Sequence, residues 1–165
     1  MKTVDINSID KKNFKCYKFH NDKSFYYGEV AYLDEMNNII EENILTEDMK
    51  IKLRLVRNGM GVMMYNVIDQ NCESRYEGNW FKDRKTGLGK YYYSDHSIYE
   101  GNFHNDLYEG YGCFTWPNND MYLGEWKLGK FDGEGEFRHN DGHILKGKFT
   151  NNYFLDVSGS IEYVI

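Results

Sequence analysis

The sequence has 165 residues, and its 26 acidic against 20 basic side chains give a formal net charge of −6. Aromatic residues make up 17% of it, beside 16 glycines and a single proline. The length suits one domain with a modest core, and so many rings argue against both intrinsic disorder and a Leu-rich helical bundle. The negative charge argues against nucleic acid as the main partner, because phosphate contacts require a basic surface.

No apolar run approaches the roughly 18 residues that a membrane-spanning helix needs, and no apolar leader follows Met1-Lys2. The cysteines Cys16, Cys72 and Cys113 are odd in number, widely spaced and without a CxxC pair. This pattern favours free thiols in a reducing compartment over a disulfide framework. We therefore expect a cytoplasmic protein.

The first part of the chain, residues 1–75, contains an acidic stretch that interrupts any regular pattern. Residues 31–49 carry six acids and no Lys or Arg. They could form an amphipathic helix with its isoleucines on one side, or an extra strand with long loops. We favour the strand, because residues 50–56 alternate polar and apolar side chains and lead into Asn58-Gly59, a dipeptide typical of hairpin turns.

From Tyr76 onward the sequence repeats with a period of 23 residues, in rows that begin at Tyr76, Tyr99, Tyr122 and Leu145. The third position of every row is glycine, and the fifth is Trp or Phe. In the three complete rows a Gly-x-Gly pair follows, then rings two and four places later, then an Asx-rich turn. Alternation with period two on both sides of a turn predicts two strands per row rather than a helix.

This pattern, YxGxW followed by GxG and a DG-type turn, resembles the MORN repeat. The resemblance covers three complete rows and part of a fourth, about half of the chain. The sequence departs from the family pattern at His96 and Asn119, which replace the usual turn glycine, and at Leu145, which replaces the leading tyrosine. The resemblance implies a scaffold at the cytoskeleton or near a membrane, since some family members take the tail of a motor protein in a groove.

We expect an all-β fold, an elongated and twisted antiparallel β-meander of tandem 23-residue hairpin repeats in a single layer. Two strands per row, spaced about 4.8 Å apart, would add about 10 Å of length per repeat. Glycine inside a strand marks a close approach, so we expect the rings to lie over the glycines of the neighbouring strand. The predicted organisation is 1–75 as degenerate N-terminal repeats or cap, 76–149 as regular repeats, and 150–165 as a degenerate half-repeat or cap.

Weaker copies of the pattern extend it in both directions. Residues 20–28 line up with residues 139–147, and Gly59-Met60-Gly61 followed by Met63 and Tyr65 resembles a second half-row. Residues 159–163 resemble another second half-row. These copies predict that the N-terminal half belongs to the same sheet as the regular rows.

The sequence carries no signature of an enzyme. The Gly-x-Gly pairs lie in predicted strands, without the downstream helix and Lys-Ser/Thr of a phosphate-binding loop. The five histidines do not cluster with cysteines at zinc spacing. We predict no catalytic residue, no metal and no cofactor.

The ring stripe suggests a non-catalytic scaffold or adaptor that binds a helical or extended segment of a motor or cytoskeletal protein in an aromatic groove. Tyr and Trp are the residues that most often anchor interfaces. The predicted partner-binding residues are Tyr76, Trp80, Tyr91, Tyr93, Tyr99, Phe103, Trp116, Tyr122, Trp126 and Phe149.

Two other functions stay open at this point. Lys82, Arg84 and Lys85 form a basic loop that could bind anionic lipid, including phosphoinositides, and place the protein peripherally at a membrane. An open terminal strand or the aromatic faces could instead pair two copies into a homodimer or a self-associating structure.

Overall fold

The structure is a computed structural model and describes residues 15–19, 23–67, 73–155 and 161–163. Its thirteen strands belong to one sheet, and every pair of neighbours is antiparallel. The strands are β1 (Lys15–Phe19), β2 (Ser24–Leu33), β3 (Ile39–Ile40), β4 (Arg54–Tyr65), β5 (Ser74–Phe81), β6 (Arg84–Tyr92), β7 (Ile98–His104), β8 (Leu107–Thr115), β9 (Met121–Lys127), β10 (Lys130–Arg138), β11 (Ile144–Thr150), β12 (Tyr153–Leu155) and β13 (Ile161–Tyr163).

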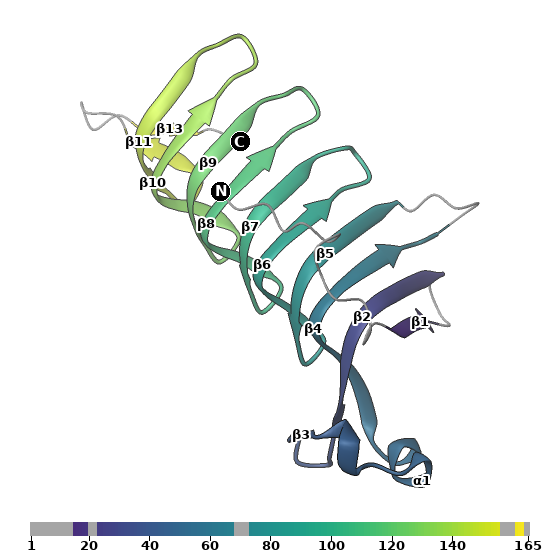
Figure 1. Cartoon of the computed structure of the whole chain (residues 1–165). Helices are drawn as coiled ribbons and strands as arrows, with labels where there is room; N and C mark the ends of the chain where they lie inside the picture. Colours follow the sequence, from purple (N-terminus) through teal and green to yellow (C-terminus); the bar gives the residue numbers. More distant parts are fainter. Residues whose placement is uncertain (1–14, 20–22, 68–72, 156–160, 164–165) are drawn as a thin grey trace.

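The strands follow one another across the sheet in chain order, except that β3 pairs with the end of β2 and lets β4 lie beside β2. Figure 1 shows the resulting elongated stack of curved hairpins. This confirms the predicted all-β meander, including the membership of the N-terminal strands in the same sheet. Parts of the predicted N-terminal cap (1–14, 20–22 and 68–72) and of the predicted C-terminal half-repeat (156–160 and 164–165) lie outside the described residues.

Each hairpin is built around a buried tyrosine that fills the space above two paired glycines. Gly78 of β5 pairs with Gly89 of β6, and the Tyr76 ring covers both. A Cβ atom at position 89 would lie 2.4 Å from the Tyr76 hydroxyl, so only glycine fits there. The hydroxyl donates a hydrogen bond to the Asn79 carbonyl at 2.9 Å. The same arrangement recurs at Tyr26, Tyr99 and Tyr122, which confirms that rings rescue the strand glycines.

A bulge bends each hairpin just beyond the paired glycines. Gly78 pairs with Gly89 while the next residue, Asn79, pairs with Thr86, so Gly87 and Leu88 have no opposite residue on β5. Gly87 takes a φ of +58°, a backbone conformation that glycine adopts without steric cost. Extra residues at this place increase the local twist and curve the strand toward one side.

The N-terminal hairpin repeats this design, and one prediction about it is wrong. Gly28 pairs with Gly61, and Val30 pairs with Arg57, so the extra residues lie in β4. Asn58-Gly59 is therefore not a hairpin turn. It lies within β4, at the bulge, because Gly59 with a φ of +97° occupies the position that Gly87 has in the next hairpin.

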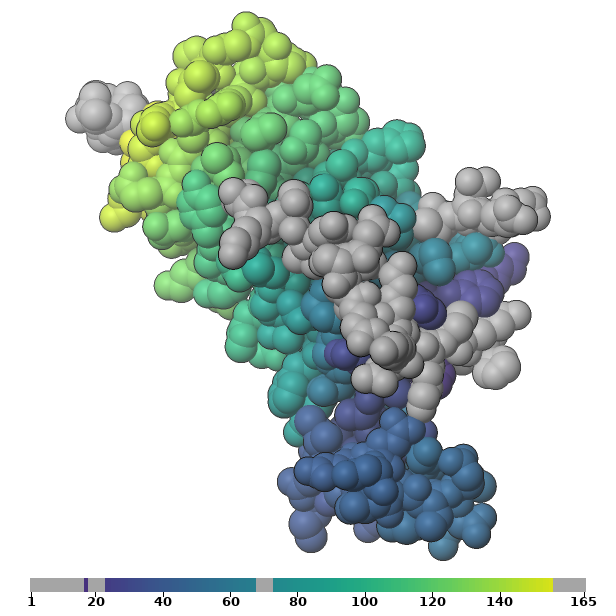
Figure 2. All heavy atoms as spheres, viewed as in Figure 1, coloured from purple at the N-terminus to yellow at the C-terminus, as the bar shows by residue number. Residues whose placement is uncertain are grey.

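The acidic stretch forms the long loop of this first hairpin and projects from the body, as Figure 2 shows for the blue segment. It contains the short strand β3, the 3-10 helix η3 (Glu42–Ile44) and the helix α1 (Glu47–Ile51). The extra strand that we predicted within residues 31–49 is only the two-residue strand β3. Residues 50 and 51, also predicted as strand, belong to α1. No described helix is long and apolar enough to cross a membrane.

The main core is a cluster of mostly aromatic buried side chains, and a smaller second cluster consists of Ala31, Leu33 and Val56. The main cluster lies along one face of the sheet. Its members are Tyr26, Met63, Tyr76, Trp80, Tyr99, Phe103, Tyr122, Trp126, Phe131, Phe137, Leu145, Phe149 and Phe154. Ring pairs within it meet edge to face, for example Tyr99 and Trp126 with centroids 5.3 Å apart, a geometry that adds about 0.5–1.5 kcal/mol per pair. Charged side chains lie outside this cluster, and some of them form ion pairs between neighbouring strands, for example Lys90 of β6 with Glu100 of β7.

Candidate binding groove

Seven of the ten predicted partner-binding rings belong to the core and not to an accessible surface. Trp80 and Trp126 are only 3% and 5% exposed. Their indole N–H groups donate to the Gly61 carbonyl at 3.4 Å and the Gly112 carbonyl at 3.1 Å. In this structure their role is packing, because the glycine gaps draw the rings inward. The seven are Tyr76, Trp80, Tyr99, Phe103, Tyr122, Trp126 and Phe149.

The other three predicted rings, Tyr91, Tyr93 and Trp116, are half-buried and belong to a continuous row of rings that we call the ring ladder. Neighbours in this row have centroids 4.5 to 6.0 Å apart. The ladder crosses the sheet from β4 to the end of β10, so it presents one aromatic surface that spans several repeats. In order along the sheet it consists of Tyr65, Tyr91, Tyr93, Phe114, Trp116, Phe137 and His139.

Four ladder residues were missing from the predicted site. Phe114, Phe137 and His139 occupy the positions two and four places after a Gly-x-Gly pair, as Tyr91 and Tyr93 do. Tyr65 has the same position after Gly61 in the N-terminal hairpin. The column position was therefore a usable signal, and it separates the ladder from the buried column of the first and fifth row positions.

The hairpin turns opposite the ladder form a second row, which we call the turn row. Its members are the second turn residues of successive hairpins, each with φ between +71° and +79°. Asp83, Asp106 and Asn152 each accept, through a side-chain oxygen, a hydrogen bond from a backbone N–H of the preceding hairpin, at 2.8 to 2.9 Å. The remaining member, Gly129, has no side chain to accept such a bond.

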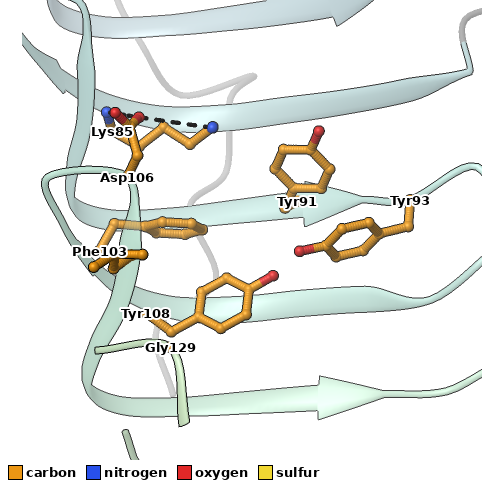
Figure 3. Close-up of a pocket in the computed structure, with 8 residues that line it drawn as sticks. Lys85, Tyr91, Tyr93, Phe103, Asp106, Tyr108 and Gly129 are labelled. Atoms are coloured by element: carbon orange, nitrogen blue, oxygen red, sulfur yellow. Dashed lines mark hydrogen bonds and ion pairs between the residues drawn. The ribbon is translucent and has the colours of Figure 1, made fainter. Parts of the chain in front are cut away.

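Three adjoining pockets follow the turn row and together form the binding groove, and the ring ladder borders the second and third of them. The first, about 200 Å³, shares Arg57 and Asp83 with the second, about 400 Å³. The second shares Lys85 and Asp106 with the third, about 320 Å³. We call the third the Tyr108 pocket, and Figure 3 shows it between Lys85 and Asp106 on one side and Tyr91 and Tyr93 on the other.

One repeat position, four residues before the paired glycine of each returning strand, decides how open the groove is. Along the sheet it is occupied by Arg57, Lys85, Tyr108 and Phe131. Tyr108 stacks on Tyr99 at 3.6 Å, and Phe131 stacks on Tyr122 at 3.8 Å. Arg57, Lys85 and Tyr108 line the described pockets and Phe131 lines none of them, so the groove is open beside the two cations and filled by a ring at β10.

The cations of the groove are paired with acids of the turn row. Arg57 Nε lies 3.1 Å from Asp83 Oδ1, and the guanidinium lies 4.3 Å from the Trp80 ring. Lys85 Nζ lies 3.7 Å from Asp106 Oδ1 and 5.2 Å from the Tyr91 ring centroid. Burial lowers the pKa of the Lys85 ammonium, and the nearby Asp106 carboxylate opposes that shift.

The predicted lipid-binding residues do not form one basic surface. Lys85 points into the groove, and Lys82 Nζ donates to the Asn37 carbonyl at 2.7 Å. Arg84 is exposed. Arg84 and Lys85 are successive residues of β6, so their side chains point to opposite faces of the sheet. The contact with Asn37 holds Lys82 away from both.

The described residues hold no group of three or more His, Cys, Asp or Glu side chains that could bind a metal ion. Cys113, half-buried on β8, is a free thiol whose pKa is raised, mainly by burial. His139 and His143 lie with ring centroids 5.7 Å apart, next to the end of the ladder.

The fold and groove define a repeat protein whose single curved sheet carries an aromatic core and an aromatic rim. The sequence profile of the MORN repeat matches residues 76–98, 99–121 and 122–144. These are the three complete 23-residue rows, so residues 76–144 consist of three MORN repeats. No curated protein matches the chain.

Proposed function

We propose that the protein is a non-catalytic scaffold or adaptor that binds a helical or extended segment of a partner protein in the groove. The site would operate at the cytoskeleton or at a membrane-associated structure. The observation that carries this proposal is the ring ladder, a continuous row of mostly half-buried rings that borders two of three joined pockets.

The ladder suits a protein partner because of what its rings offer. Tyr and Trp supply large apolar area with a polar tip, and they are enriched among the residues that dominate interface energetics. Tyr91 and Tyr93 contact each other at 4.5 Å, and both line the Tyr108 pocket. Because these rings are held by neighbours before any partner arrives, little side-chain entropy remains to be lost on binding.

The groove also has the form that a segment of chain needs. Its pockets follow one another across the hairpins, from β2 through β4 and β6 to β8. A helix or strand laid along this line would place successive side chains into successive pockets. The buried floor rings Trp80 and Phe103 line two of the pockets and keep the floor apolar.

A non-catalytic role is supported by the chemistry of the site. The titratable groups in the groove are phenols and two ion pairs, Arg57 with Asp83 and Lys85 with Asp106. The pKa of Tyr93 is raised, chiefly by burial, so its hydroxyl stays neutral and serves as a hydrogen-bond donor rather than as a base. The MORN-repeat family is in general non-catalytic, which agrees with this assignment.

The test uses a displayed library of random peptide segments, selected on the intact chain. Segments that bind the wild type are then measured by titration against Tyr93→Ala and Tyr65→Ala, two positions of the ladder. We expect affinity to fall about tenfold or more for at least one of these variants, as for an anchoring ring. Tyr111→Ala is the matched control, because Tyr111 is 48% exposed and belongs to no described ring contact.

Circular dichroism and unfolding curves for each variant separate loss of binding from loss of fold. Failure of the wild type to select any segment would refute the proposal. So would selected segments whose affinity depends on Tyr111 but on neither ladder residue.

A further inference from the structure

The Tyr108 pocket contains polar groups that the fold itself does not use fully. The Tyr108 hydroxyl is buried and has no hydrogen-bond partner, and it is the one such side-chain atom among the described residues. A buried donor left without a partner is destabilising, because the group has lost its hydrogen bonds to water. In Figure 3 the hydroxyl ends of Tyr108 and Tyr93 both point into the space between the ladder and the turn row.

The second such group is the Lys85 ammonium on the opposite side of the pocket. The Lys85 side chain is only 16% exposed, whereas its partner Asp106 is 45% exposed and lies on the rim. The separation of 3.7 Å between Nζ and Oδ1 makes an ion pair but exceeds hydrogen-bonding distance. The same Asp106 oxygen already accepts the Lys85 backbone N–H at 2.9 Å.

We propose that the Tyr108 pocket takes the carboxylate of an Asp or Glu side chain carried by the partner segment. The inference rests on the proposed function and names the chemistry that selects the segment. The carboxylate accepts from the Lys85 ammonium and from a phenolic hydroxyl of the pocket, while Phe103 and the stem of the acidic side chain make apolar contact.

Charge and hydrogen bonding favour an acid over other side chains. A cation from the partner would meet Lys85 and be repelled at short range. An apolar side chain would exclude water from Lys85 and from the Tyr108 hydroxyl without replacing its hydrogen bonds. A carboxylate satisfies donors of both kinds, and charge-assisted hydrogen bonds are roughly twice as strong as neutral ones.

The depressed pKa of Lys85 agrees with this assignment. Burial is the largest cause of the shift, and the rim carboxylate of Asp106 offsets it only in part. A second carboxylate inside the pocket would favour the charged ammonium and raise its pKa. Binding of the segment should therefore be accompanied by proton uptake at Lys85 at alkaline pH.

A peptide source for the carboxylate fits the geometry better than an anionic lipid. The pocket is walled by the ladder rings Tyr91 and Tyr93 and lies within a groove that continues past it. Lipid surfaces are recognised by clusters of exposed cations. Lys82, another cation of the loop that precedes Lys85, is engaged by the Asn37 carbonyl.

The experiment starts from the segments selected on the wild type. We expect them to share an Asp or Glu whose change to Asn or Gln lowers affinity for the wild type about tenfold, the loss of one charge-assisted hydrogen bond. The same change should have less than about a twofold effect on Lys85→Met, as a double-mutant cycle requires of interacting groups. Lys90→Met is the control, because Lys90 lies on the same strand, pairs with Glu100 and lines none of the described pockets.

A second variant tests the orphan hydroxyl. Tyr108→Phe should weaken the acidic segment while leaving its Asn or Gln counterpart and the unfolding free energy unchanged or improved. Segments that bind through Tyr93 and carry no common acid would overturn this inference and leave the proposed function standing. Binding of phosphatidylserine vesicles that is lost in Lys85→Met would assign the pocket to lipid and overturn it as well. If no segment binds, both proposals fall together.

Discussion

The hairpin β5–β6 and the hairpin β9–β10 have the same backbone design and differ in what covers their central tyrosine. In β9–β10, Phe131 is 1% exposed and stacks on Tyr122 with ring centroids 3.8 Å apart. In β5–β6 the same place is taken by Lys85, whose ammonium lies 5.7 Å from the Tyr76 centroid. Both hairpins keep the paired glycines and the bulge, so the repeat tolerates either side chain.

The hairpin between them, β7–β8, shows an intermediate state. Tyr108 stacks on Tyr99 as Phe131 stacks on Tyr122, but its hydroxyl remains without a partner in the Tyr108 pocket. The three hairpins therefore share one backbone geometry although the side chains that line the groove differ. One position per hairpin changes the groove from open and polar to filled, and the floor beneath stays the same.

The largest predicted effect concerns the floor that both hairpins share. Burial raises the pKa values of Tyr26, Tyr76, Tyr99 and Tyr122 far above the usual value. A raised folded-state pKa means that the stability is complete below about pH 10, the unfolded value, and is lost as pH rises beyond it. Each pH unit above about 10 costs about 1.4 kcal/mol per phenol, so we expect cooperative alkaline unfolding of both hairpins.

Denaturant unfolding across an alkaline pH series, followed with phenolate absorbance, measures this effect. Stability that stays constant between about pH 9 and pH 11 would contradict the burial of the four hydroxyls. Phenolate should form together with unfolding and not before it.

The next effect separates the ring from its hydroxyl. Tyr99→Ala should lower the free energy of unfolding by about 3–5 kcal/mol, because a buried ring leaves a cavity among Phe103, Tyr108 and Trp126. Tyr99→Phe should cost about 1 kcal/mol, the loss of one hydrogen bond to the Asn102 carbonyl. Chemical denaturation compares the two. Equal losses for Ala and Phe would show that the hydroxyl, and not packing over the glycines, dominates.

Exchanging the side chains that distinguish the two hairpins should exchange their properties. Phe131→Lys should lower stability by about 2–4 kcal/mol, since it replaces a buried ring by a desolvated cation. Lys85→Phe should raise stability by about 1 kcal/mol, because it fills the pocket with apolar surface. It should also abolish binding of the selected acidic segments. Lower stability of Lys85→Phe in thermal unfolding would contradict the idea that the open pocket is retained at a cost.

The smallest effect concerns the turn row. Gly129→Asn should raise stability by about 0.5–1 kcal/mol, because its side chain can accept the Tyr108 backbone N–H as Asn152 accepts that of Phe131. The backbone permits it, since Gly129 has a φ of +79° and Asn152 a φ of +72°. The reverse change, Asp106→Gly, should cost a similar amount. Unfolding midpoints that move in the same direction for both variants would exclude this role of the turn row.

Much of the fold was predictable because the same pattern of rings and glycines recurs in every row of the repeat. The period of 23 residues and the spacing of the glycines indicated paired strands, and Tyr76, Gly78 and Gly89 occupy the predicted relation of ring to gap. Asn58-Gly59 was misleading because its local turn preference is real but weaker than the register of β2 against β4. The acidic loop was poorly predicted because its apolar residues, such as Ile44 and Ile51, stay exposed and impose no periodic constraint.

The candidate groove was predicted only in part. Of the predicted binding rings, Tyr91, Tyr93 and Trp116 lie in the ladder. It could not separate them from Trp80 and Trp126, because both sets are large rings at regular spacing. The bulge after each pair of glycines curves the strand and turns one set inward over the backbone.

The sequence by itself determined the strand pairing, because every hairpin repeats the glycine gaps and the rings that fill them. The tertiary structure alone decided which rings stay accessible, since burial depends on the neighbouring hairpin across the bend. It also decided that Lys85 turns into a pocket beside an unpartnered Tyr108 hydroxyl. That arrangement joins residues of adjacent repeats, and no single row of the sequence contains it.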